Sequence, residues 1–402
     1  MTDSDHHQSF TLTRAITLLL AVTCGTSVAG LYYAQPLLVT IADHLNVSSS
    51  TAGFLVTASQ IGYTIGLMFL VPLGDVMDRR RLILGMLAVA VVTSAGAAAS
   101  PNFATLCVLL VLGGIASATA MVVVPMAVGL ADPSERGRVT GTVMGGLLLG
   151  ILLARTVSGL IAEVGGWRTV YVVAAVALAV LAVLLLRILP PIAPTASLTY
   201  PKLMRSIFTI IGRESVLRGR MALGFLAMCG FAMMWTASTF LLAEEYGYSD
   251  GVIGLFGLAG AAGAAGAPVM GRLADAGHAR LSTTLTWSMV LIGWGLLALG
   301  MHNVFAFIVG ILVFDFGVQA AHVTNQNRIY GLNPDERSRL TTAYMVTFFF
   351  GGVAGSVLAS LAYDAGGWLL VCAIGAVIAA AALAIWATIC ATIERTTVGP
   401  TG

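Results

Sequence analysis

Long apolar runs separated by short polar segments make up nearly the whole chain. Each run is close to the length of about 20 residues that an α-helix needs to cross a bilayer core. The twelve runs are 14–38, 51–73, 82–100, 103–130, 139–163, 168–189, 219–243, 250–272, 281–300, 303–330, 340–363 and 367–391. Transmembrane β-strands are shorter and alternate between apolar and polar residues, which these runs do not. The pattern therefore predicts an all-α polytopic membrane protein with twelve transmembrane helices.

The composition excludes a soluble protein. Hydrophobic residues make up 58% of the chain and charged residues only 9%, whereas soluble domains carry about 25% charged residues. The mean hydropathy is +0.94. A net charge of +2 is too small to indicate a nucleic-acid-binding face. The five cysteines lie within apolar runs and form no CxxC pair, so we expect buried thiols with no metal.

The positions of the positive charges predict the orientation. If the runs alternate in direction, every Lys and Arg residue except Arg155 and Arg168 falls within or beside segments on one side. Positively charged loops stay in the cytoplasm. We therefore expect both termini to be cytoplasmic and the protein to lie in a bacterial inner membrane. The first run contains Arg14 and has no evident cleavage site, so we interpret it as a retained span.

The two halves of the chain repeat one another at a nearly constant offset. The matching segments are Pro133–Arg138 and Pro334–Arg339, Gly165–Trp167 and Gly366–Trp368, and Gly74–Asp78 and Gly271–Asp275. All three pairs fall in corresponding loops. This pattern predicts two six-helix bundles related by a parallel internal repeat, an arrangement found among secondary transporters.

The expected organisation has three parts. An N-terminal bundle covers residues 1–189, a cytoplasmic linker covers 190–218, and a C-terminal bundle covers 219–402. Within the linker, Leu203, Ile207 and the Ile210–Ile211 pair recur at helical spacing among basic residues. This spacing predicts a short amphipathic helix at the membrane surface, although a solvated linker is the alternative.

The segment Gly74–Arg81 resembles the loop signature between spans two and three of the major facilitator superfamily. Gly271–Asp275 resembles the second copy of this signature, and Tyr32–Leu37 resembles the 12-span drug:proton antiporter branch. The chain departs from that branch at Leu110, where an arginine is usual, and at Ala154–Arg155, where a glycine–proline pair is usual. The resemblance implies alternating access powered by an ion gradient, and no ATP-binding loop is present in the sequence.

The same resemblance implies a gate at the cytoplasmic loops. Glycine permits a tight turn, a carboxylate suits the N-terminus of a helix in the other half, and arginines form ion pairs that break as the halves move. The gating candidates are Gly74, Asp75, Asp78, Arg79, Arg136, Asp275 and Arg337. The alternative is that these charges only set the orientation of the chain.

Ionisable residues inside the membrane are costly and usually functional. Asp315, Gln319, His322 and Gln326 follow one another at positions that share one helix face. Asp315, His322 and Arg155 are the candidates for proton coupling. Arg155 has two alternatives, since it suits either a structural contact or the binding of an anionic substrate group. For the polar stripe formed by these four span-ten residues, the alternative is a structural hydrogen-bonded network between helices.

Several polar, aromatic and methionine side chains suit a cavity for varied organic ligands. The candidates for substrate contact are Tyr32, Tyr33, Gln35, Met233, Trp235, Gln319 and Gln326. We expect a monomeric, proton-driven exporter of small amphiphilic compounds, with no catalytic activity, cofactor or metal. A proton-linked importer of a small organic anion and a membrane sensor are the alternatives.

Overall fold

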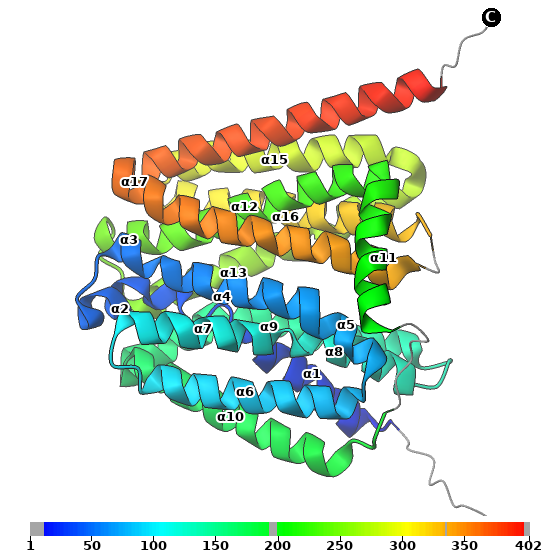
Figure 1. Ribbon diagram of the computed structural model, residues 1–402. Coiled ribbons are helices and arrows are strands. Elements are labelled where there is room, and N and C mark those ends of the chain that lie inside the picture. Colours follow the sequence, from blue (N-terminus) through cyan, green and yellow to red (C-terminus); the bar gives the residue numbers. More distant parts are fainter. Residues whose placement is uncertain (1–11, 193–198, 334–335, 398–402) are drawn as a thin grey trace, which may run out of the picture.

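The computed structural model describes residues 12–192, 199–333 and 336–397, and every element in these ranges is helical. Two groups of long helices lie side by side, one from the first half of the chain and one from the second (Figure 1). Most helices run along a common direction, and a shorter one, α11 (Tyr200–Arg213), crosses one end of the molecule.

The first bundle consists of six spans, several of them interrupted. Its helices are α1 (Arg14–Ala29), α2 (Leu38–Leu45), α3 (Ser49–Ala52), α4 (Phe54–Ile65), α5 (Val71–Val76), α6 (Arg79–Ala98), α7 (Phe103–Ser117), α8 (Thr119–Leu130), α9 (Arg136–Gly165) and α10 (Trp167–Ile188). A 3-10 turn, Gln35–Leu37, joins α1 to α2, and a π-helical turn, Gly66–Leu70, joins α4 to α5.

The second bundle repeats this plan. Its helices are α12 (Ser215–Glu244), α13 (Asp250–Ala265), α14 (Ala267–Leu273), α15 (Ala279–Leu299), α16 (Val304–Tyr330) and α17 (Arg337–Thr397). The long α17 turns back on itself at Gly366 and Gly367, where Gly367 adopts φ 64°. This left-handed conformation is accessible to glycine at little cost.

The predicted helical membrane fold is confirmed. In the described part of the chain, ten helices are long and apolar enough to cross a membrane, and one of them, Arg337–Cys390, contains the turn at Gly366 and so crosses twice. The shorter α1 and the α2 segment that follows it supply the remaining span. The predicted end of this first span at residue 38 is wrong, because helix resumes after the Gln35–Leu37 turn and runs to Leu45.

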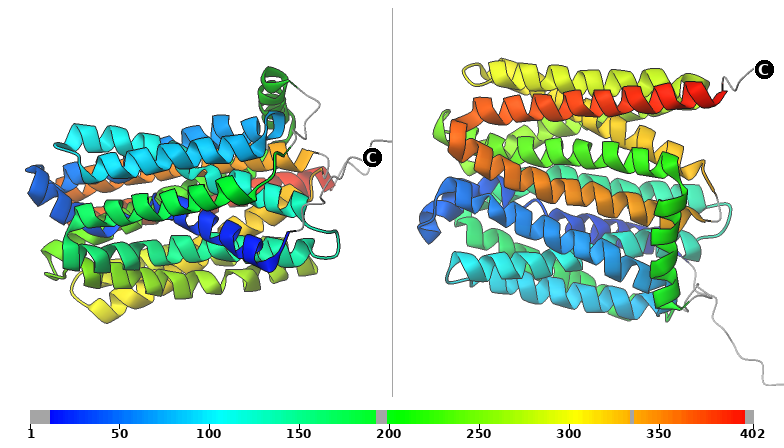
Figure 2. Two further views of the ribbon diagram at one scale, coloured as in Figure 1. Left: turned by 90° about the horizontal axis from the view of Figure 1, so that it is seen from below. Right: turned by 45° about the horizontal axis from the view of Figure 1, so that its top comes forward.

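The two ends of the molecule differ. The near end, on the right of Figure 1, holds α11 and the starts of α1, α6, α9 and α17. The far end holds α2, α3 and the turn of α17. The right view of Figure 2 shows α11 standing across the near end. The predicted amphipathic helix is therefore present, and Leu203, Ile207 and Ile210 form its buried face.

The bundles meet closely along α9 and α13, toward the far end. A Cβ at Gly159 would collide with the backbone of Asp250, and one at Gly254 would lie 2.6 Å from the carbonyl oxygen of Arg155. Within the second bundle, a Cβ at Gly351 or Gly355 would collide with the α12 backbone. Small residues allow helix backbones to approach in this manner. These glycines of spans five, eight and eleven thus allow the helices to pack closely.

Candidate functional site

Arg155 lies at the junction of the two bundles and is only 6% exposed. Its Nε donates a hydrogen bond of 2.6 Å to Oε1 of Gln35, in the turn between α1 and α2. Its guanidinium carbon lies 4.3 Å from the centre of the Trp235 ring and 4.8 Å from that of Tyr32. Phe231 supplies a third ring at 5.6 Å. Aromatic faces attract a cation most strongly where water is excluded.

Asp315 is the carboxylate of this site. It is 3% exposed, and the indole Nε1 of Trp235 donates a hydrogen bond of 3.3 Å to its Oδ1. A Cβ at Gly260 would collide with both Asp315 and Trp235, so the α13 backbone closes over the carboxylate. In the described part of the chain, Asp315 and Arg155 form no ion pair within 4.0 Å. Trp235 therefore contacts both charged side chains. Its Nε1 donates to the Asp315 carboxylate, and its ring faces the Arg155 guanidinium.

Two donors in this site have no partner among the described residues. They are Nη2 of Arg155 and Nε2 of Gln35, both fully buried. A buried donor without a partner costs about 1–3 kcal/mol. The turn that presents Gln35 begins with the Gln35–Pro36 pair, and Thr239 of α12 donates a hydrogen bond of 2.9 Å to the Gln35 carbonyl.

The side chains of the polar stripe predicted on span ten contact different partners. The His322 ring nitrogen Nδ1 lies 3.0 Å from the Tyr344 hydroxyl, and the His322 ring packs against Tyr344 and Phe348 of α17. Gln326 donates to the Met345 sulfur. These contacts stay within the second bundle, whereas Asp315 reaches the bundle junction. Gln319 is half-buried.

Two other predicted substrate contacts lie apart from Arg155. The Tyr33 ring packs edge-on against Tyr171 of α10, within the first bundle. Met233 is completely buried in the core. Tyr32 and Tyr33 are adjacent in sequence, so periodicity alone did not reveal which of them faces the junction.

A cavity of about 430 Å³ lies between the bundles in the near half of the molecule. The wall contributed by the first bundle is largely apolar, with Leu67, Val71, Met121, Val122, Val124, Pro125 and Met144. The wall contributed by the second bundle is largely polar, with Gln326, Tyr330, Arg337, Ser338, Thr341, Thr342 and Met345. Gly74, Asp75 and Arg79 stand at the same cavity.

Three of the near-end residues predicted to form the gate, Asp75, Asp78 and Arg79, make contacts within the first bundle. Asp75 forms an ion pair of 2.9 Å with Arg79, and Arg79 Nε also donates to the Gly74 carbonyl. Asp75 thus pairs within its own bundle in this structure. Asp78 accepts a hydrogen bond from the Arg81 backbone and caps α6. It forms no ion pair with the second bundle among the residues that the structure describes.

The remaining gating candidates differ in their surroundings. Arg337 lies 5.3 Å from the centre of the Tyr330 ring, beside the cavity. Arg136 is exposed at the start of α9. The side chain of Asp275 lies outside the described part of the structure.

The far end is closed by polar contacts that the sequence patterns did not predict. The Thr40 hydroxyl donates to Asp250, and the Ser249 hydroxyl donates to Glu163, so each bundle gives a donor to a carboxylate of the other. Deeper in the junction, the hydroxyls of Thr57 and Ser356 lie 2.8 Å apart. In the sequence, the only indication of these contacts was that the carboxylates of Asp250 and Glu163 lie at the ends of predicted spans.

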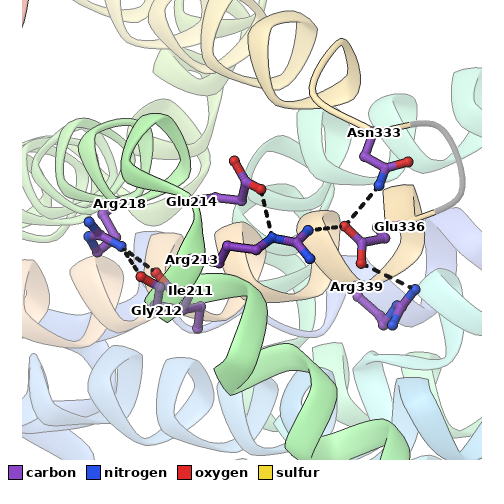
Figure 3. Close-up of polar contacts among 8 residues, drawn as sticks. All are labelled: Ile211, Gly212, Arg213, Glu214, Arg218, Asn333, Glu336 and Arg339. Carbon is purple, nitrogen blue, oxygen red and sulfur yellow. Dashed lines mark hydrogen bonds and ion pairs between the residues drawn. The ribbon is translucent and has the colours of Figure 1, made fainter.

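The linker helix α11 is attached to both bundles. Near its start, the Tyr200 hydroxyl donates 2.9 Å to the Phe69 carbonyl, in the π-helical turn of span two. At its end, Arg213 forms ion pairs with Glu214 and Glu336 (Figure 3). Hydrogen bonds to these two carboxylates raise the pKa of Arg213 above its usual value.

Within the described residues, no group of three or more His, Cys, Asp or Glu side chains is arranged to hold a metal ion. The site instead combines a buried cation, a buried carboxylate and an amphiphilic cavity at the junction of two helical bundles. These features define a polytopic membrane protein with a site between its repeated halves.

Comparison with known proteins supplies the family. The family model of the Major Facilitator Superfamily matches residues 18–283 and 221–401, and the chain belongs to this family. A putative uncharacterized transporter of Escherichia coli, YgaY, is 48% identical over 387 residues, covering 96% of this chain and 97% of its own. A probable transporter of Streptomyces coelicolor is 32% identical, covering 89% and 83% of the two chains.

Solved structures share the fold. A nucleoside transporter, NupG, has a TM-score of 0.74 and 11% identity, with 93% of this chain and 98% of that chain covered. A bacterial homolog of the human lysosomal transporter Spinster has a TM-score of 0.69 and 14% identity, with 92% and 95% covered. The protein is thus a multi-pass membrane transporter of the major facilitator type, and such transporters bind small-molecule substrates.

Proposed function

We propose that this transporter moves small amphiphilic organic compounds by alternating access, with transport coupled to protons. The observation that carries the proposal is the cavity between the bundles, which has one apolar wall and one polar wall. A ligand with a hydrophobic body and a polar group satisfies both walls at once. A sugar, by contrast, leaves the apolar wall without a partner.

The structure supports assignment to an inward-facing state. The positive-inside rule puts the near end, with Arg79–Arg81, Arg136 and Arg337, in the cytoplasm. The cavity lies in this half, while the far end is closed by the Thr40–Asp250 and Glu163–Ser249 contacts. The proposal accordingly includes cytoplasmic termini, a bacterial inner membrane and a monomer.

Alternating access requires the bundles to move as units. We assign residues 1–189 and 219–402 to the two moving units and 190–218 to the linker between them. Opening of the far end then separates α9 from α13 and exposes Arg155 and Asp315. Gly74, Asp75 and Arg337 meet at the near end when the cavity closes, which is the gating role proposed for them.

Asp315 is the proposed proton carrier. It is the buried carboxylate at the bundle junction, and Trp235 and Gly260 enclose it in the present conformation. An ionised carboxylate in this position depends on the charge of Arg155 for stabilisation. The protonation state of Asp315 is therefore linked to whether the two bundles are in contact at this junction. His322 bonds within its own bundle and is the weaker candidate.

Direction is the part of the proposal that rests on substrate chemistry. The methionine-containing apolar wall favours efflux of varied amphiphiles, because such surfaces adapt to different ligands. Uptake of an organic anion is the second candidate, favoured by the unpartnered donors at Arg155 and Gln35. No observation in the described part of the structure specifically favours the third candidate, a membrane sensor.

The test uses purified protein in liposomes that contain a pH-sensitive dye. Amphiphilic amines, neutral amides and carboxylates are added in turn, and the direction of proton movement is recorded. Movement with at least one class, absent in empty liposomes and in Asp315→Asn, supports coupled transport. Substrate flux without proton movement contradicts proton coupling, and binding without flux contradicts transport.

A further inference from the structure

The buried positive charge of Arg155 at the bundle junction is only partly balanced by the described side chains around it. Arg155 has three aromatic rings around its guanidinium, but in the described part of the chain no carboxylate lies within ion-pair distance of it. Asp315 is held away by its hydrogen bond to Trp235. A buried cation with no close counter-ion is expensive, so the junction favours an additional negative group.

Donors for such a group are already in place. Nη2 of Arg155 and Nε2 of Gln35 are both buried without a partner, and the 2.6 Å hydrogen bond between Arg155 Nε and Gln35 Oε1 fixes the two side chains side by side. A planar carboxylate accepts hydrogen bonds through two oxygens, and such charge-assisted bonds are the strong ones. A ligand ammonium group is disfavoured beside Arg155, because the buried guanidinium repels a second positive charge.

The surroundings define the rest of the ligand. Tyr32, Phe231 and Trp235 present ring faces beside the guanidinium, which suits an apolar or aromatic body next to the anionic group. In the present conformation Gly257 and Gly260 of α13 close over the site. The ligand therefore enters when α13 separates from α9.

We propose that Arg155 and Gln35 form a binding subsite for the carboxylate of a small organic acid whose apolar body packs on Tyr32, Phe231 and Trp235. This inference rests on the proposed function and names its substrate class. The ligand and the Asp315 carboxylate compete for the same cation, so loss of the Asp315 charge strengthens ligand binding. A shared cation of this kind favours transport of the acid together with a proton, which corresponds to the uptake mode named above as the second candidate.

The test measures binding to purified full-length protein by calorimetry. The probes are 3-phenylpropanoate, its neutral amide and 3-phenylpropylamine, which share one body and differ in the polar group. We expect the carboxylate to bind at least about tenfold more tightly than the amide, because a charge-assisted hydrogen bond replaces a neutral one. Octanoate, octanamide and octylamine repeat the comparison with a flexible body.

The variants locate the subsite. Arg155→Gln and Gln35→Leu are expected to remove the preference for the carboxylate, and Asp315→Asn to tighten carboxylate binding several-fold. Arg168→Gln is the matched control, since Arg168 also lies 4.3 Å from a tryptophan ring centre, that of Trp167 on α10. It is expected to change nothing. If Arg155→Gln does not fold, Gln35→Leu and Asp315→Asn still test the assignment.

Other outcomes overturn the inference. Equal affinity for carboxylate and amide, tighter binding of the amine, absence of binding by all probes, or weaker carboxylate binding in Asp315→Asn each contradict it. The proposed function is judged separately, by proton-coupled flux of the amide or amine in liposomes. Coupled flux of these compounds without a carboxylate preference leaves the transporter assignment intact and removes the anion subsite.

Discussion

The Thr40 hydroxyl on α2 lies 2.8 and 2.7 Å from the two carboxylate oxygens of Asp250 on α13, and so joins the two bundles at the far end. Glu163 and Ser249 form the reciprocal contact at 2.9 Å, with the carboxylate on the first bundle and the hydroxyl on the second. These two contacts must break before the far end opens. Their strength therefore sets part of the balance between the closed and open states.

Thr40→Val is expected to shift this balance toward far-end opening. The hydroxyl donates to a charged acceptor, and such a bond contributes about 1.5–3 kcal/mol, so the open population rises by roughly tenfold or more. The measurement is the labelling rate of a single cysteine, Thr57→Cys, by a membrane-impermeant maleimide in a variant without the native cysteines. Thr57 lies deeper in the same junction, opposite Ser356.

Thr169→Val is the matched control for this experiment. Thr169 is also near the far end, but its hydroxyl bonds to the Gly165 carbonyl of the same bundle. Its labelling rate should equal that of the parent protein. Equal rates in Thr40→Val and Thr169→Val would show that the Thr40–Asp250 contact does not hold the far end closed.

Asp315→Asn is expected to abolish proton-coupled flux, since the amide cannot take up and release the proton. Exchange of labelled for unlabelled substrate should continue, because it needs no net proton transfer. Membrane insertion should be unaffected, as the amide can still accept the bond from Trp235 Nε1. Coupled flux and exchange are measured in the same liposomes, and unimpaired coupled flux would exclude Asp315 as the proton carrier.

His322→Gln is the comparison for Asp315→Asn. His322 contacts Tyr344 and Phe348 within the second bundle, so its replacement should lower the free energy of unfolding and leave proton coupling in place. Loss of coupling in His322→Gln with normal coupling in Asp315→Asn would reverse the two assignments. Thermal unfolding in detergent separates a stability effect from a transport effect.

The helical membrane fold was predictable because membrane spans are specified by local chemistry. Length and hydrophobicity of each run define a span regardless of tertiary contacts. The break in the first span escaped prediction because the apolar run continues through Gln35–Leu37, although Pro36 is a local helix-breaking signal. The cost of interrupting the helix is offset by contacts such as that from Thr239. Such compensation comes from a distant part of the chain.

The candidate site was predictable in its residues but not in its pairings. Arg155 and Asp315 stand out in sequence because charge is rare inside membranes. The role of Trp235 between them depends on how α9, α12 and α16 come together, which no local pattern encodes. The helical periodicity of span ten similarly grouped Asp315 with His322, although neighbouring helices direct these side chains to different partners.

Asp75→Asn is expected to slow turnover several-fold with little change in ligand affinity. In the present structure Asp75 pairs with Arg79 beside the cavity, across from Arg337 and Ser338 at the start of α17. Closure of the near end brings a carboxylate toward that helix N-terminus, where the helix dipole favours negative charge. Transport rates and binding constants are measured on the same preparation.

Asp132→Asn provides the control for Asp75→Asn, because Asp132 is an exposed carboxylate in the near-end loop between spans four and five. It should transport at the parent rate. A loss of affinity in Asp75→Asn at unchanged turnover would place Asp75 in the binding site and contradict its gating role.

Arg213→Gln is expected to loosen α11 from the second bundle. Arg213 joins the end of α11 to Glu336, which also accepts from Asn333 and lies 3.8 Å from Arg339. Exposed ion pairs are screened by solvent and contribute little to stability, so backbone amide exchange in Tyr200–Arg213 should accelerate only a few-fold. Because the Glu214 and Glu336 carboxylates raise the pKa of Arg213, its cation persists throughout the neutral range.

The effect of the linker depends on both of its attachments. Tyr200→Phe removes the bond to the Phe69 carbonyl at the other end of α11, and should accelerate exchange at the start of the helix instead. Arg205→Gln is the control, since Arg205 is exposed on the same helix. If α11 restrains the bundles as they move, Arg213→Gln combined with Tyr200→Phe changes the transport rate more than either variant alone. A double variant with the parent rate would show that α11 is a passive connection.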